Sequence, residues 1–186
     1  MESLVAEKKT KVADFLAIEV EPRFIYELIN GQIVKKSAPS PKHQITLREL
    51  LTRMNSFVKE KKLGEVLTAP LDVFFGEYNS LQPDLLFVAK ARKGIITDNG
   101  VEGAPDLIME ILSPSTMKHD RGDKMKIYRE YQVREYWIVD PKNQSIEVYQ
   151  YQNGDYDLVS FAVEAGEITS PVLEEFSLDV GTVFSA

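Results

Sequence analysis

A strand followed by a helix in the middle of the chain carries charged residues where buried elements should be apolar. The pattern predicts a strand over Asp106–Leu112, a polar turn over Ser113–Thr116 and a helix over Met117–Tyr131. Successive side chains of a strand point to opposite faces, so Glu110 lies on a face with apolar neighbours. A buried carboxylate costs free energy unless it is paired or holds a metal ion.

The helix repeats this anomaly. Helical spacing places Asp120 and Lys124 on one stripe with Ile127, Tyr128 and Tyr131, the stripe that should face the sheet. An inward carboxylate on the strand and an inward lysine on the helix are typical of a functional site. An internal salt bridge, with Asp120 acting only as a helix cap, is an equally weighted alternative.

Composition limits the classes of protein that fit. A chain of 186 residues with 44% hydrophobic residues fits one domain, 1–186, in which 1–20 form an N-terminal arm and 21–186 the core. The absence of cysteine excludes disulfides and thiolate metal sites, and it suits a cytoplasmic location. No segment approaches the roughly 20 apolar residues of a membrane helix. The net charge of -7 argues against diffuse, charge-driven binding to nucleic acid.

The N-terminal half offers two clear elements. Asn30-Gly31 between the β-prone runs 24–29 and 32–35 predicts a β-hairpin. Ser40 is a good helix cap, and Pro41 suits the first turn of a helix that ends near Lys62. His43 falls on the apolar stripe at the beginning of that helix.

The remaining segments are mostly β-prone. We expect strands over 65–75, 81–90 and 135–139, a loop or short helix over 92–101, a hairpin over 145–151 and 155–163, and a short strand in the tail. This order of elements predicts a mixed α/β fold with a central sheet.

Asp84, in the second of these strands, is the natural partner of Glu110. Neighbouring strands lie about 4.8 Å apart, so the two carboxylates can meet if their strands pair. Asp106 is four residues from Glu110, or roughly 13 Å along the strand, which is too far to share one ion. Two carboxylates, a backbone carbonyl and waters suit Mg²⁺ or Mn²⁺. Lys124 nearby could stabilise charge on a phosphate.

These features together resemble the PD-(D/E)XK nuclease superfamily and, more narrowly, the Uma-two family of restriction endonucleases. The resemblance covers about residues 24–180 and rests on the order of several short motifs: Tyr26–Gly31, His43, Pro83-Asp84, Ala104–Asp106, Glu110–Ser115, Asp120, Lys124, Tyr128, Val133 and Glu135–Pro141. It implies a restriction-endonuclease-like αβββαβ core, with Asp84 and Glu110 as metal ligands. It also implies Mg²⁺ or Mn²⁺ as cofactor, DNA as substrate and a homodimer.

One position departs from the superfamily pattern. The strand motif should continue with a lysine two residues after the acidic residue, and Leu112 stands there instead. Lys124 on the next helix is the natural substitute. We therefore expect a Mg²⁺-dependent endonuclease with Asp84, Glu110 and Lys124 as its catalytic set. The alternative is an inactive nuclease-like fold that binds nucleic acid or protein.

Four further residues are candidates for supporting roles. Asp120 can fix Lys124 from one helical turn away, and Asp106 is expected to anchor the start of its strand. His43 is either a packed helix-end residue or a group that contacts phosphate or transfers a proton. For Glu27 we favour a surface charge over a place at the edge of the site.

Overall fold

The computed structural model describes residues 9–19, 21 and 24–185. Its central sheet has six strands in the order β12-β11-β10-β9-β6-β3. β9 and β10 are parallel and the other neighbouring pairs are antiparallel, so the sheet is mixed, as predicted. The strands are β3 (Gly64–Thr68), β6 (Leu85–Ala89), β9 (Leu107–Ile111), β10 (Glu135–Asp140), β11 (Ser145–Gln152) and β12 (Asp155–Val163).

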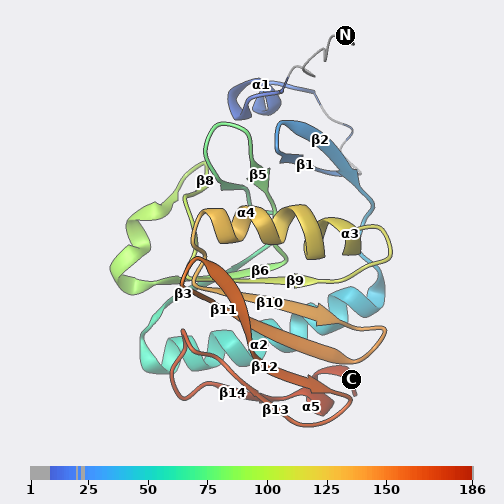
Figure 1. Ribbon diagram of the computed structural model, residues 1–186, viewed down its shortest axis with the longest axis vertical. Coiled ribbons are helices and arrows are strands. Elements are labelled where there is room, and N and C mark those ends of the chain that lie inside the picture. The colour runs from blue at the N-terminus through green and yellow to red at the C-terminus, as the bar shows by residue number, and fades with distance from the viewer. Residues whose placement is uncertain (1–8, 20, 22–23, 186) are drawn as a thin grey trace.

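Helices cover both faces of this sheet (Figure 1). On one face lies α2 (Pro41–Lys61), whose Leu50, Met54 and Val58 are buried against the sheet. The other face carries one helical segment in three parts, α3 (Met117–His119), a π-helical turn η2 (Asp120–Lys124) and α4 (Met125–Glu130). This arrangement confirms the predicted αβββαβ core.

A second six-stranded sheet, which the sequence pattern did not predict, packs beside α4. Its order is β2-β1-β5-β4-β8-β7, and Val73, Leu81 and Val101 join one apolar cluster with Ile108 and Tyr128. Its strands are β1 (Ile25–Ile29), β2 (Gln32–Lys36), β4 (Val73–Phe74), β5 (Ser80–Leu81), β7 (Ile96–Thr97) and β8 (Gly100–Glu102).

Two predicted strands are corrected by this sheet. The expected strand over 65–75 divides into β3 and β4, because Pro70 has no N–H to donate to a ladder and the chain leaves the central sheet there. The expected strand over 81–90 likewise divides into β5 and β6. The segment 92–101, expected as a loop or short helix, contains the end of a short 3₁₀ helix, η1 (Lys90–Ile95), and the β7–β8 hairpin, which was not predicted.

The two ends of the chain complete the fold. The predicted hairpin is present as β1 and β2, with positive φ angles at Asn30 (53°) and Gly31 (82°), as a tight turn requires. The short helix α1 (Val12–Leu16) precedes it, whereas the first eight residues of the expected arm lie outside the described residues. In the tail, β13 (Glu167–Thr169) pairs with β14 (Ser177–Asp179), and α5 (Val180–Phe184) follows. Within the described part of the chain, no helix is long and apolar enough to cross a membrane.

Candidate active site

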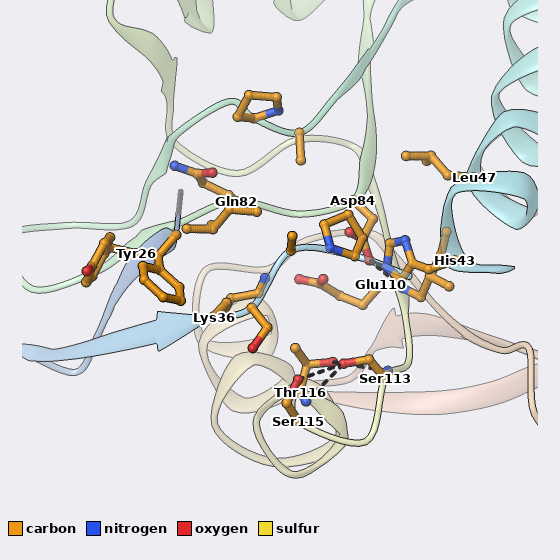
Figure 2. A pocket seen from close by; sticks show the side chains of 18 of the residues that line it. Tyr26, Lys36, His43, Leu47, Gln82, Asp84, Glu110, Ser113, Ser115 and Thr116 are labelled. Carbon is orange, nitrogen blue, oxygen red and sulfur yellow. Dashed lines mark hydrogen bonds and ion pairs between the residues drawn. The ribbon is translucent and has the colours of Figure 1, made fainter. Parts of the chain in front are cut away.

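Asp84, the residue immediately before β6, lies opposite Glu110 on the neighbouring strand β9. β6 and β9 are antiparallel with Leu85 opposite Met109, and the same register one residue further puts Asp84 opposite Glu110. The Ile111 N–H donates a hydrogen bond of 2.7 Å to Oδ2 of Asp84. Figure 2 shows both carboxylates at one cavity. The juxtaposition expected from strand parity is therefore present.

His43 holds Asp84 from the first turn of α2. Its Nε2 lies 3.2 Å from Oδ2 of Asp84, and the residue is buried. Burial raises the pKa of Asp84, but His43, Lys36 and the Ile111 N–H together outweigh burial and leave that pKa lowered. Among the described residues, none donates a hydrogen bond to Oδ1 of Asp84. The second oxygen is thus available to a ligand.

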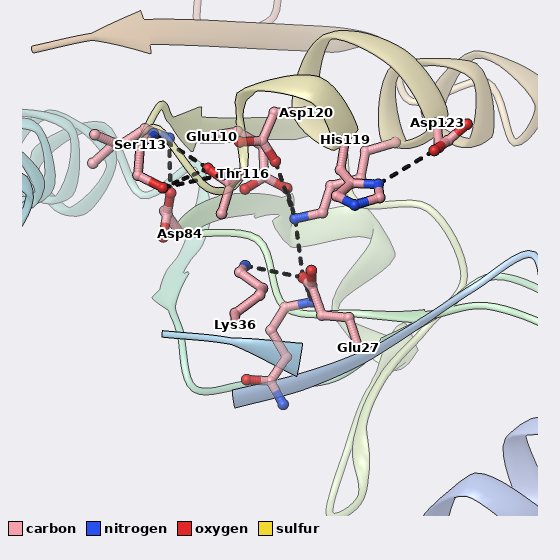
Figure 3. A network of polar contacts seen from close by, with 12 residues as sticks. Glu27, Lys36, Asp84, Glu110, Ser113, Thr116, His119, Asp120 and Asp123 are labelled. Carbon is pink, nitrogen blue, oxygen red and sulfur yellow. Dashed lines mark hydrogen bonds and ion pairs between the residues drawn. The ribbon is translucent and has the colours of Figure 1, made fainter. Parts of the chain in front are cut away.

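Lys124 is the centre of a buried ion cluster. Its Nζ lies 3.0 Å from Oε1 of Glu27, 3.0 Å from Oε1 of Glu110 and 3.3 Å from Oδ1 of Asp120. Figure 3 shows these three carboxylates gathered around the network. The hydroxyl of Tyr128 also donates to Oε1 of Glu110, at 2.6 Å. Burial lowers the pKa of Lys124, but the surrounding carboxylates outweigh burial and raise it well above its usual range. The internal salt bridge of the alternative interpretation is therefore present. Asp120 lies inside the helical segment and pairs with Lys124, so its cap-only role in that interpretation is wrong.

The site holds more acidic side chains than lysines. Its buried or nearly buried carboxylates outnumber its lysines by two: Glu27, Asp84, Glu110 and Asp120 against Lys36 and Lys124. Burial, followed by the charges of Asp120 and Asp84, raises the pKa of Glu110 to about 8 despite Lys124. Burial also raises the pKa of Asp120. A divalent cation would favour the ionised form of these carboxyl groups and offset their mutual repulsion.

The donor set fits such an ion only in part. Among the residues that the structure describes, no group of three or more His, Asp or Glu side chains is arranged to hold a metal. Asp84 and Glu110 supply two carboxylates, and within the described residues Oε2 of Glu110 accepts no hydrogen bond. An ion held by one or two carboxylates that keeps several waters is typical of Mg²⁺.

The β1–β2 hairpin contributes two further groups, one of which the sequence pattern did not reveal. Glu27 is 1% exposed, so the preference for a surface charge was wrong. Burial would raise its pKa, but Lys124 and Lys36 lower it. Lys36, which we did not predict, lies 3.3 Å from Oε1 of Glu27. The sequence signal that could have revealed Lys36 is strand alternation, which puts Lys36 on the same face of β2 as the apolar Val34. In the structure Val34 and Lys36 are both partly buried, whereas Lys35 is exposed.

Lys36 and Lys124 differ in access to the cavity. The cavity has a volume of about 690 Å³, and Asp84, Glu110, His43 and Lys36 line it, whereas Lys124 is fully buried and does not reach its wall. In Figure 2, Lys36 faces Glu110 and Asp84 across this space. The structure thus places Lys124 next to Glu110, as expected, but the lysine at the cavity wall is Lys36.

Asp106 lies outside this cavity and has the anchoring role that we expected. It is fully buried at the other end of β9, where it accepts a hydrogen bond of 2.8 Å from the Ala89 N–H. Arg92 and Arg134 each approach it within 3.2 Å. These contacts join the beginning of β9 to β6 and to the segment before β10.

Comparisons with known proteins identify the family and the fold. The sequence model of the Uma2 family, described as "Putative restriction endonuclease", matches residues 12–181. The "Uncharacterized protein sll1609" of Synechocystis is 28% identical over 142 residues, which cover 74% of this chain and 78% of that protein. The crystal structure of "a putative nuclease belonging to DUF820" from Anabaena variabilis shares the fold, with a TM-score of 0.75 at 24% identity over 94% of this chain and 97% of that one. On the extent of the family match, the chain belongs to the Uma2 family of "Putative restriction endonuclease" proteins.

Proposed function

We propose that the protein is a Mg²⁺- or Mn²⁺-dependent endonuclease that hydrolyses phosphodiester bonds of DNA. The observation that carries this proposal is the excess of acidic side chains over lysines around Asp84 and Glu110, both of which lie at the wall of a cavity. Membership of a family described as restriction endonucleases supports the reaction class.

In this proposal Asp84 and Glu110 hold the metal ion. When bound, such an ion supplies an activated water and neutralises charge that develops on the phosphate. His43 positions Asp84 through the 3.2 Å contact. Lys124 and Tyr128 fix the orientation of Glu110 by sharing its Oε1, which leaves Oε2 for the ion.

Lys36 is the group that we assign to the phosphate itself. It is the cation at the cavity wall, and its side chain is 13% exposed, whereas that of Lys124 is 0% exposed. A lysine placed near a phosphate stabilises the charge that grows in the transition state. Lys124 then serves as a positioning residue.

The test is nicking of a supercoiled plasmid with Mn²⁺ by the wild type and by Asp84→Asn and Glu110→Gln. Each substitution should lower the rate by at least about 10²-fold, the usual effect of losing one charge-stabilising group. Asp123→Asn is the matched control, because Asp123 is a carboxylate that pairs with His119 outside the cavity. Equal nicking by wild type and both site variants would refute the assignment.

The binding-module alternative rests on one observation. Leu112, at the position where the superfamily has its lysine, is 5% exposed and packs in an apolar cluster. A wild type that binds DNA, keeps its fold and never cuts would favour this alternative.

A further inference from the structure

The cavity beside Asp84 and Glu110 has a second, apolar part that metal-dependent hydrolysis does not explain. The lining of this part includes Phe15, Leu16 and Ile18 from the N-terminal segment, Tyr26 from β1 and Leu47 from α2. Leu16 is 55% exposed and Ile18 is 43% exposed. A volume of about 690 Å³ falls in the range of sites that enclose a small organic group, about 300–1,000 Å³.

The same cavity is poor in the residues that bind a DNA duplex. Duplex-binding proteins neutralise several backbone phosphates with lysine and arginine. Among the described residues that line this cavity, Lys36 is the only lysine or arginine. A duplex also keeps its bases stacked inside, where an apolar wall cannot contact them, whereas unpaired bases pack readily on aromatic and apolar side chains.

We propose that the cavity accepts an unpaired nucleotide of single-stranded DNA. Its phosphate lies toward Lys36, Asp84 and Glu110, and its base packs against the apolar part formed by Leu16, Ile18 and Tyr26. The assignment rests on the proposed nuclease function and narrows its substrate to an unpaired strand. It predicts that base contact, rather than many phosphate contacts, supplies most of the affinity.

The first readout is binding, which does not need turnover. Fluorescence anisotropy with a labelled 12-nucleotide single strand, and with the duplex of the same sequence, is measured in Ca²⁺. The single strand should bind at least tenfold more tightly than the duplex. The double variant Leu16→Ser/Ile18→Ser should weaken single-strand binding roughly tenfold, within the range of stacking one base on a side chain. Both residues are well exposed, so the fold tolerates the change.

Leu158→Ser is the matched control, because Leu158 is 52% exposed but lies on β12, away from the cavity. It should bind the single strand as tightly as the wild type does. A duplex that binds as tightly as the single strand, or a double variant that binds like the control, overturns the inference.

The second readout separates this inference from the nuclease proposal. Circular single-stranded DNA and relaxed circular duplex of the same sequence are incubated with the protein and Mn²⁺. Faster opening of the single-stranded circle supports both proposals. Equal or faster cutting of the duplex overturns the single-strand assignment and leaves the nuclease proposal intact. Cutting of neither circle, together with preferential single-strand binding, refutes the nuclease and retains the binding site.

Discussion

Lys35 and Lys36 are neighbours in β2 and have opposite surroundings. The amine of Lys35 lies 3.5 Å from the centre of the Phe24 ring and pairs with Glu21 on the exposed side of the strand, whereas Lys36 faces the carboxylates. Lys36→Met should lower the rate of DNA cleavage by about 10²–10³-fold, because the cation at the cavity wall is lost. Lys35→Met should cleave within about twofold of the wild type. Plasmid nicking measures both rates, and a similar loss in both variants would contradict the role of Lys36.

Glu110 should make the stability of the metal-free protein depend on pH. Burial raises its pKa from 4.5 to about 8, so the folded protein holds this proton between those values and the unfolded chain does not. Its contribution to stability is therefore complete below about pH 4.5 and is lost as the pH rises through about 8, with a slope of at most roughly 1.4 kcal/mol per pH unit. Glu110→Gln should remove that slope. Urea unfolding in EDTA from pH 5 to pH 9 measures the free energy of unfolding of the wild type and of Glu110→Gln. If that free energy depends on pH in the same way in both proteins, the raised pKa of Glu110 is contradicted.

At the scale of elements, Lys124 joins the π-helical turn η2 to both sheets. Its partners come from β1, β9 and η2 itself. Removing one member of a buried ion cluster leaves uncompensated charge, so Lys124→Met should reduce the free energy of unfolding by about 3–5 kcal/mol. Lys126→Met, at an exposed position of α4, should stay within about 0.5 kcal/mol. Adding Glu110→Gln to Lys124→Met should recover part of the loss in urea unfolding, and purely additive losses would show that the two residues are not coupled.

The same elements show what the sequence can and cannot reveal. The pairing of Asp84 with Glu110 could be predicted, because strand alternation and the spacing between neighbouring strands are local rules. The inward stripe of Asp120, Lys124 and Tyr128 could also be predicted, because the spacing of residues along a helix is another local rule. The place of Glu27 could not, because it depends on how a separate hairpin packs on the central sheet, and no local period encodes that contact.

At the scale of the whole molecule, a shared core should make both sheets unfold together. Leu81 and Val101 of the second sheet pack in one cluster with Ile108 and Tyr136 of the central sheet. The described residues should therefore behave as one domain, as the length of the chain predicts. Thermal unfolding followed by Trp137 fluorescence and by far-ultraviolet circular dichroism should then give one midpoint. The homodimer implied by the family resemblance stays a prediction, which light scattering would check.

Metal binding should raise that single midpoint. An ion that binds the folded protein alone stabilises it by an amount that grows with the ratio of its concentration to its dissociation constant, about 2.7 kcal/mol at a hundredfold excess. Asp84, just before β6, and Glu110, on β9, meet only after these two strands pair, so the unfolded chain lacks the site. Mn²⁺ should thus shift the wild-type midpoint upward by several degrees in both signals. The double variant Asp84→Asn/Glu110→Gln should show no such shift, and Asp157→Asn, on the exposed side of β12, should keep it. A shift that persists in the double variant would place the metal elsewhere on the chain.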